Sequence, residues 1–244
     1  MTAEEKSRGG DLAGGVSDGS VRLNKFLAER LGLSRRQADD KIAAGEVKVD
    51  DHPAVLGERI DKSSKVWYNG KVVPFQTAYL YLLMNKPVGY VCSRKQQGEI
   101  PTIYSLLPEK YRNLKTVGRL DVNSSGVILL TNDGTLAFEL THPKFLKSKE
   151  YEVLLDRALE PLHQQMISDY GLELPDGKSK LMLTRLNDER TRWRVEMSEG
   201  RNRQIRRTFA AVGYEVRELE RKRFGTYELG DLKPGEFREI DKQG

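Results

Sequence analysis

A single acidic residue, Asp121, stands where a carboxylate could do chemistry. It lies in VGRLDVNSSGVILLTNDG, residues 117–134, between an Arg-Leu pair and a segment that becomes abruptly apolar. Polar turn residues follow it and then a predicted buried strand, an arrangement that would hold the carboxylate rigidly at a surface opening. The simpler alternative is an aspartate that caps a turn or pairs with a surface arginine.

Glycosidic bonds are usually cleaved by two carboxylates, which lie about 5 Å apart in retaining glycosidases. No second acid stands at a comparable strand–turn boundary near Asp121, and Asp133, in an Asn-Asp-Gly sequence, is predicted to be a turn residue. A partner from a distant part of the chain stays open as an alternative. The sequence therefore indicates either chemistry by one carboxylate or a pair that the fold assembles.

The composition indicates a soluble globular protein, because the 244 residues are 38% hydrophobic and 32% charged. No apolar run approaches the roughly 18 residues that a membrane span requires, and residues 1–20 lack the features of a signal or transit peptide, so we expect a disordered leader. The one cysteine, Cys92, excludes an internal disulfide framework and indicates a cytoplasmic protein. The histidines, His52, His142 and His163, share no ligand spacing, so we predict no metal site.

The net charge of +5 suggests a polyanionic partner, and the distribution of charge is more informative than its sum. Residues 201–223 hold eight Lys or Arg against three Glu, and residues 21–74 hold eleven basic against eight acidic side chains. Two separate basic regions favour two contacts on one long polyanion.

The first folded unit is predicted to span residues 21–74. The apolar spacing of VRLNKFLAERLG indicates a helix, and a second helix is expected to begin at Ser34 with Gln37 in the capping-box position. The alternation in EVKVDD predicts a strand, and Asn69-Gly70 in KVWYNGKVV favours a hairpin with a type I′ turn. Two short helices would thus precede a few small strands.

The second unit is predicted to span residues 79–241, after a join at residues 75–78. Strands are expected in YLYLLMNKPVGYVCS, KEYEVLLD, SKLMLTRLN, TRWRVEMSEG and EVRELERKRFGTYELG, and helices in TIYSLLPEKY, TLAFELTHP, EPLHQQMISDYG and RNRQIRRTFAAVG. Their irregular alternation is unlike a doubly wound parallel fold. We predict an α+β chain in which a mixed, largely antiparallel sheet carries flanking helices.

Six basic residues of the first unit would spread over one side of the helix pair and the following strand: Arg22, Lys25, Arg35, Arg36, Lys41 and Lys48. An ordinary solvated helix pair explains the charges equally well. However, VRLNKFLAERLGLSRRQADDKIAAGEVKVDD resembles the S4 domain, a small RNA-binding module, in its apolar spacing, its S-R-R helix start and its G-x-V-x-V-D strand entry. The resemblance implies binding to structured RNA through shape and backbone.

The larger unit resembles the pseudouridine synthases, in particular the RsuA-type branch that modifies ribosomal RNA. The resemblance rests on GRLDVNSSGVILLTNDG, MNKPVGYVCS, the KEYEV segment and EGRNRQIRRTFAAVG, in that order, and extends from about Val21 to Ile240. It implies that a uridine in RNA is isomerised to pseudouridine by breaking its N-glycosidic bond, rotating the base and rejoining it through C5, without cofactor or metal.

The same resemblance implies roles for individual residues. Asp121 matches the catalytic aspartate, which either attacks the substrate or removes the ribose 2′ proton, and Tyr151 matches the tyrosine that stacks on the target base. Arg206 matches the basic residue that pairs with the aspartate and keeps it ionised, and Ile205 is expected to pack at the base pocket. Arg119 matches the arginine that helps to hold the flipped-out nucleotide.

The remaining basic residues of the last motif, Arg201, Arg203 and Arg207, are predicted to contact the RNA backbone. Many relatives have His where this chain has Arg203, and we expect that difference to adjust phosphate contact. The predicted partner is ribosomal RNA or a ribosomal subunit precursor, with relatives of either subunit sharing these motifs, and the simplest oligomeric state is a monomer. The alternatives are a non-catalytic RNA-binding or ribosome-assembly factor and a DNA-binding protein, although a convincing recognition helix is absent from the sequence.

Overall fold

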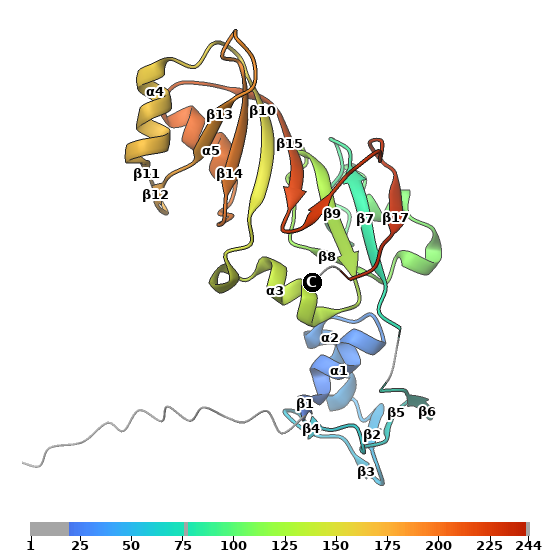
Figure 1. The fold of residues 1–244 in the computed structure, drawn as a ribbon. Helices are drawn as coiled ribbons and strands as arrows, with labels where there is room; N and C mark the ends of the chain where they lie inside the picture. Colours follow the sequence, from blue (N-terminus) through green and yellow to red (C-terminus); the bar gives the residue numbers. More distant parts are fainter. Residues whose placement is uncertain (1–19, 76–77, 243–244) are drawn as a thin grey trace, which may run out of the picture. The chain divides into compact units, whose positions relative to one another are not determined.

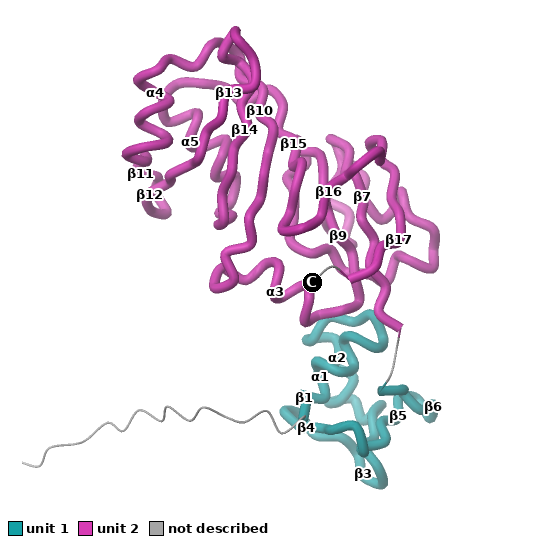
Figure 2. Tube along the Cα trace, in the orientation of Figure 1, with its two compact units in different colours: residues 1–77 teal, residues 78–244 magenta. Residues whose placement is uncertain are grey.

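The computed structural model describes residues 20–75 and 78–242, so the predicted leader lies outside the described residues apart from Ser20. The chain divides into two compact units between Thr77 and Ala78 (Figure 2). Each unit is described by itself. Among the described residues, no helix combines the length and the apolar character needed to cross a membrane.

The described part of the first unit has two helices and two small sheets, close to the predicted element order (Figure 1). Its elements are β1 (Val21–Arg22), α1 (Leu23–Arg30), α2 (Arg35–Ala43), β2 (Val47–Val49), β3 (His52–Pro53), β4 (Arg59–Ile60), β5 (Val66–Tyr68) and β6 (Lys71–Val73). The sheet order is β3-β2-β5-β6, and β1 pairs with β4. One face of the larger sheet supplies Val47, Val49, Val66 and Val73 to a core shared with α1 and α2.

Two local predictions for this unit are confirmed. Ser34 caps α2, since its hydroxyl accepts from the Gln37 amide at 3.1 Å while the Gln37 side chain accepts from the Ser34 amide at 2.8 Å. Asn69 and Gly70 join β5 to β6 with φ values of 46° and 74°, the left-handed conformations that a type I′ turn requires.

The second unit is built on a nine-stranded sheet in the order β13-β14-β10-β15-β9-β7-β17, with β8 paired to β9 and β16 to β15. The strands are β7 (Tyr81–Lys86), β8 (Lys115–Val117), β9 (Ser125–Thr131), β10 (Lys149–Leu155), β13 (Met182–Arg185), β14 (Arg192–Met197), β15 (Val216–Phe224), β16 (Tyr227–Glu228) and β17 (Phe237–Glu239). Every pairing is antiparallel except that of β9 with β15. The predicted mixed, largely antiparallel sheet is confirmed.

Helices and turns flank this sheet: α3 (Gly134–Thr141), α4 (Pro161–Gln165), which continues as a π-helical turn (Met166–Tyr170), and α5 (Gln204–Ala211). A separate small hairpin contains β11 (Leu172–Leu174) and β12 (Gly177–Ser179). The helix predicted in TIYSLLPEKY is wrong, because this segment forms two short 3₁₀ turns, η1 (Ile103–Leu106) and η2 (Glu109–Tyr111). Pro108 separates them, and proline disfavours a helical conformation in the residue before it.

Apolar side chains cover both faces of β7 and β9, which explains why these strands appear in the sequence as continuous apolar runs. Leu82 and Ile128 belong to one core, whereas Leu83 and Leu129 belong to another on the opposite face. Such strands are rigid supports for the loops at their ends. The loop that carries Asp121 lies directly before β9.

The contact between β9 and β15 requires a glycine. Gly126 pairs with Arg221, and a Cβ atom at Gly126 would lie 2.2 Å from the carbonyl oxygen of Arg221. The φ of Gly126 is +106°, which side chains with a Cβ rarely adopt. The sheet is therefore continuous only because residue 126 has no side chain.

We predict that Gly126→Ala destabilises the second unit by more than about 4 kcal/mol, because the clash involves backbone that cannot move without separating two strands. Urea-induced unfolding measures the effect. Gly235→Ala is the matched control: Gly235 also has a positive φ, +89°, but its added Cβ would meet nothing within 4 Å. The control should lose only the roughly 1–2 kcal/mol of backbone strain, and equal losses in the two variants would contradict the close-approach argument.

Candidate active site

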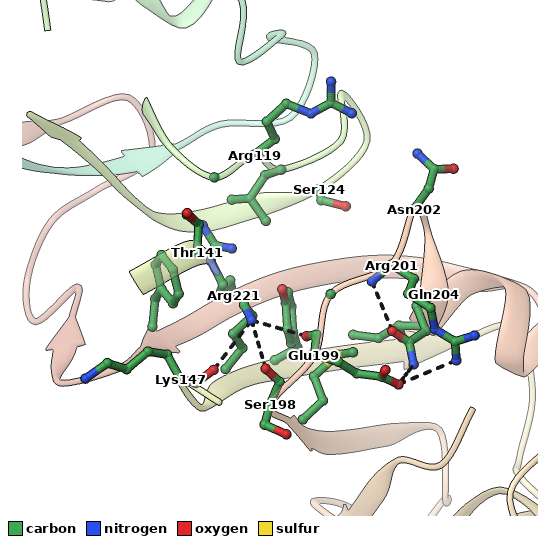
Figure 3. A pocket seen from close by; sticks show the side chains of 18 of the residues that line it. Arg119, Ser124, Thr141, Lys147, Ser198, Glu199, Arg201, Asn202, Gln204 and Arg221 are labelled. Atoms are coloured by element: carbon green, nitrogen blue, oxygen red, sulfur yellow. Dashed lines mark hydrogen bonds and ion pairs between the residues drawn. The ribbon is translucent and has the colours of Figure 1, made fainter. Parts of the chain in front are cut away.

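A pocket beside the β9–β15 junction gathers most of the residues predicted to do chemistry. Four segments line it: residues 118–124, residues 140–151, residues 197–205 and the middle of β15. Figure 3 shows side chains from all four around the hollow. The predicted residues that line it are Arg119, Asp121, Tyr151, Arg201, Arg203 and Ile205.

Asp121 reaches the pocket from the turn before β9. Its side chain is 30% exposed, and its Oδ2 lies 3.8 Å from Nη1 of Arg203. Arg203 precedes α5 in a left-handed conformation with φ 48° and ψ 31°. Non-glycine residues in this region store strain, which is common where a side chain must be aimed at a functional site.

The predicted direct pairing of Arg206 with Asp121 is wrong. Arg206 donates from Nη1 to the Val216 carbonyl and from Nη2 to the Asn123 carbonyl, each at 2.6 Å. Burial lowers the pKa of Arg206, and the charge of Asp121 opposes that shift, so the two groups interact electrostatically without an ion-pair contact. Arg206 lies in the first turn of α5 and donates to two backbone carbonyls, whereas Arg203 lies just before the helix and is the arginine near Asp121.

Tyr151 and Ile205 form apolar walls of the pocket. Tyr151 is 9% exposed and Ile205 is 4% exposed, and both also belong to the main core of the unit. A flat aromatic ring fixed by core packing can stack on a base with little loss of side-chain entropy. Arg119 is exposed, and in Figure 3 its side chain points away from the hydrogen-bonded group of Glu199, Arg201 and Gln204.

Arg201 and Arg207 differ from their predicted role as phosphate contacts. Arg201 donates to the carbonyls of Asp176 and Gly177 at 2.9 and 2.8 Å, and Arg207 binds the Asp176 carboxylate through two bonds of 2.9 and 2.7 Å. The hydrogen bond from Arg207 lowers the pKa of Asp176. Both guanidinium groups therefore hold the β11–β12 turn against α5 instead of standing free for RNA.

Gln204 orders the turn that carries Arg203. Its Oε1 accepts from the Arg201 amide at 3.1 Å, and its Nε2 donates to Ser179 at 3.1 Å and also to the Glu199 carboxylate. Gln204 is 2% exposed, so these bonds are shielded from water. The residues between Glu199 and Gln204 are thereby held in one conformation.

Lys86, which sequence analysis missed, supports the loop after Asp121. It is fully buried, and its Nζ donates to the carbonyls of Ser124, Pro87 and Val122 at 2.7, 2.9 and 3.5 Å. Burial lowers its pKa to about 8, an effect that the charge of Asp121 partly opposes. The signal available in the sequence was a lysine at the end of a continuous apolar run.

Lys149, also missed, supports the opposite wall. Its Nζ donates to the carbonyls of Ser198 and Glu199 at 3.3 and 3.2 Å, and burial lowers its pKa. It lies two residues before Tyr151 on β10. One lysine thus connects the strand that carries the tyrosine to the turn that carries Arg203.

In the first unit, the six predicted RNA contacts have different surroundings. Arg22, Arg35, Arg36 and Lys48 are exposed, and Lys25 is half-buried. Lys41 forms an ion pair with Glu46 at 2.8 Å, and its contact with RNA stays a prediction.

Comparison with known proteins agrees with this geometry. Residues 80–211 match the family model described as RNA pseudouridylate synthase. The chain is 36% identical over 230 residues to "Ribosomal small subunit pseudouridine synthase A" of Pasteurella multocida, which covers 91% of this chain and 97% of the relative. A similar protein of Pseudomonas aeruginosa, "Ribosomal large subunit pseudouridine synthase B", is 35% identical and matches over 91% of this chain and 60% of its own length.

A solved structure is similar over almost the same extent. "Crystal structure of pseudouridylate synthase" superposes with a TM-score of 0.65 and 30% identity, covering 91% of this chain and 96% of that chain. The chain belongs to the RNA pseudouridine synthase family. It resembles the RsuA-type members in particular, as the relatives named for the small ribosomal subunit show.

For a pseudouridine synthase, one catalytic carboxylate is chemically sufficient. The other acid that lines the pocket, Glu199, accepts hydrogen bonds from the side chains of Gln204 and Arg201. Isomerisation uses no water as a reactant and releases no separate leaving group, so the second carboxylate of a glycosidase has no task. Asp133, the neighbouring acid, is 3% exposed and caps α3 by accepting from the amides of Thr135 and Leu136. It lies outside the set of residues that line the pocket.

The lowered pKa of Lys86 predicts a pH dependence of stability. Between pH 8 and 10.5 the unfolded chain holds the Lys86 proton and the folded chain releases it, so folding releases a proton and stability rises with pH. Wild type should therefore gain stability relative to Lys86→Met as the pH rises above 8, by up to about 1.4 kcal/mol per pH unit. Urea unfolding of both proteins from pH 7 to 10 gives the difference. A difference that stays constant with pH would contradict a buried, charged Lys86.

Proposed function

We propose that this protein isomerises a uridine of ribosomal RNA to pseudouridine, with Asp121 as the catalytic carboxylate. The observation that carries the proposal is the position of Asp121: it opens into a pocket with apolar walls at Tyr151 and Ile205, and Arg203 lies beside its carboxylate. The pocket can hold one flipped base between the tyrosine ring and the isoleucine, with the ribose toward the aspartate. Relatives named as ribosomal small subunit pseudouridine synthases, matched over 91% of this chain, support the choice of substrate.

The two steps open to Asp121 both fit this arrangement. The carboxylate either attacks the nucleotide or removes the ribose 2′ proton, and either role requires an ionised group held near the sugar. The guanidinium of Arg203 lies 3.8 Å from this carboxylate and complements its negative charge. Arg119, exposed at the rim, is in a position to contact the flanking nucleotides.

The first unit is proposed to be an S4 domain, with residues 21–74 as its extent and 79–241 as the catalytic domain. The first turn of α2 supports an RNA-binding role, because it contains Arg35 and Arg36 and no acidic residue. Basic side chains at a helix N-terminus are unfavourable with respect to the helix dipole by a few tenths of a kcal/mol. Together with the positive end of the helix dipole, they form a site that suits phosphate. A cytoplasmic location and a monomeric state remain predictions from the sequence.

Asp121→Asn should abolish pseudouridine formation and retain RNA binding, because the amide is the same size but can neither attack nor take a proton. We expect a loss of at least about a thousandfold, the order found when a catalytic group is removed from other enzymes. The experiment maps pseudouridine in both ribosomal RNAs of cells that lack the protein and express each variant. Asp188→Asn, at an exposed carboxylate that pairs with Arg185, is the control that should keep full conversion.

Two outcomes of this mapping would overturn the proposal. Conversion by Asp121→Asn at the normal rate would remove Asp121 from the reaction. Identical maps with and without the wild-type protein would favour the alternative of a non-catalytic RNA-binding or ribosome-assembly factor.

If α2 contacts phosphates, Arg35→Gln together with Arg36→Gln should make RNA binding less sensitive to salt. The slope of log K against log salt should flatten by roughly 1.4–1.8, because two phosphate contacts are lost. Titrations at several salt concentrations measure it. Lys62→Gln together with Lys71→Gln removes the same charge from exposed positions of the same unit, and an equal flattening in this control would refute a specific contact at α2.

A further inference from the structure

Arg221 is a buried arginine at the pocket for which the preceding mechanism has no use. It lies on β15 and is only 2% exposed, yet it lines the pocket together with Leu219, two residues earlier on the same face of the strand. Its backbone cannot shift, because Gly126 is packed against it. Figure 3 includes Arg221 among the side chains around the pocket.

The guanidinium of Arg221 is incompletely satisfied. Nε donates to the Val127 carbonyl at 2.8 Å and the group lies 4.7 Å from the centre of the Phe224 ring, but Nη2 is buried without a hydrogen-bond partner among the described residues. No ion pair joins Arg221 to a carboxylate within the described ranges. Arg206 also has a buried nitrogen without a partner, Nε, but both of its terminal nitrogens donate to carbonyls.

A buried cation with an unused donor is unfavourable for folding. Burial of a charge without a partner is expensive, and an apolar side chain of similar volume is often neutral or stabilising in its place. Two further cations aggravate the cost: after burial, the charge of Arg221 contributes to the lowered pKa of both Lys86 and Lys149. The presence of this buried donor, Nη2 of Arg221, is explained if a ligand supplies the acceptor that the protein lacks.

The surroundings of Arg221 favour a base over a phosphate as that ligand. The pocket near it is apolar, with Tyr151, Ile205, Leu219 and Phe224 among its buried lining residues. A phosphate carries strongly held water and is more easily met by exposed cations such as Arg119. A uracil ring instead combines an apolar face with two carbonyl oxygens that accept hydrogen bonds.

We propose that Arg221 donates from Nη2 to a carbonyl oxygen of the flipped uracil and stabilises the negative charge that the base acquires during the reaction. The inference rests on the proposed function. It adds an electrophilic group at the base, whereas Asp121 acts at the sugar.

The chemistry requires such a group whichever role Asp121 takes. When the N1–C1′ bond breaks, its electron pair stays on the base and is delocalised from N1 onto O2 and O4. The base turns, C5 forms the new bond to C1′, C5 then loses its proton, and N1 gains one from solvent. No electrons are exchanged with another reactant, so charge stabilisation is the contribution that a guanidinium can make. Such preorganised donors are worth about 100- to 1000-fold in rate in other enzymes.

The test compares Arg221→Met and Arg221→Lys with wild type in single-turnover reactions on a ribosomal RNA fragment that wild type converts. Methionine fills the volume without a charge, and lysine keeps the charge but lacks the second donor arm. Arg192→Gln is the control, because Arg192 is on β14 in the same sheet and forms ion pairs with Glu152 and Glu218. RNA affinity and thermal unfolding are measured for each protein.

We expect Arg221→Met to keep its thermal stability and RNA affinity and to lose at least about 100-fold in the rate of N-glycosidic bond cleavage. On RNA with 5-fluorouridine at the target, whose base leaves more readily as an anion, the loss should shrink by at least tenfold. Arg221→Lys should lie between Met and wild type, and it decides the question alone if the Met variant does not fold. Arg192→Gln should equal wild type.

Three results would overturn the inference. A cleavage rate within about threefold of wild type in a folded Arg221→Met protein would show that the donor is not needed. A loss of RNA affinity with an unchanged rate would indicate a phosphate contact, and an equal loss on uridine and 5-fluorouridine would indicate a purely structural role. Failure of wild type to convert any uridine would instead refute the proposed function itself, which keeps the two conclusions separable.

Discussion

The backbone of Gly126 lies against the backbone of Arg221, and the arrangement of the active site follows from this one approach. The parallel pairing of β9 with β15 is the only link between the β7–β9 half of the sheet and the β10–β14 half in the strand order of the described residues. Asp121 belongs to the loop before β9, and Tyr151 belongs to β10, which pairs with β15. The carboxylate and the stacking ring come from different halves, so their separation is set where the halves meet.

Charged side chains, rather than regular secondary structure, hold the irregular backbone around the pocket. Lys86 donates to the carbonyls of Val122 and Ser124, and Arg206 donates to the carbonyl of Asn123. The Gly89 amide also donates to the Val122 carbonyl. These donors fix the residues that follow Asp121 without touching its carboxylate. A group held in this way needs little reorganisation when the substrate arrives, which is the main source of electrostatic catalysis.

Features encoded by local sequence could be predicted, and features that depend on the packing of distant segments could not. The capping box at Ser34 and the turn at Asn69-Gly70 are properties of two to four adjacent residues, and both are present. Three of the four segments that line the pocket were also recognisable, because each contains part of a contiguous motif, whereas the β15 segment does not. The choice between Arg203 and Arg206 as the neighbour of Asp121 was not, because it depends on a left-handed residue before α5 and on the Asn123 carbonyl, 83 residues from Arg206. Lys86 and Arg221 were missed for the same reason: in the sequence they are ordinary cations, and only burial gives them a role.

The distribution of charge in the pocket suits one acid that is available for chemistry, Asp121, since the other lining acid, Glu199, is bonded to Gln204 and Arg201. Lys86 and Arg221 are buried beside Asp121, Lys149 is partly buried, and Arg203 faces it. An RNA strand already brings negative charge to such a site, and a second carboxylate without a cationic or hydrogen-bonding partner would oppose both the strand and the base as the base becomes anionic. One available carboxylate among several cations therefore suits a reaction at a ribose whose phosphates are negative and whose base becomes negative. The cations that order the loops and the cation proposed to contact the base therefore all offset negative charge at the site.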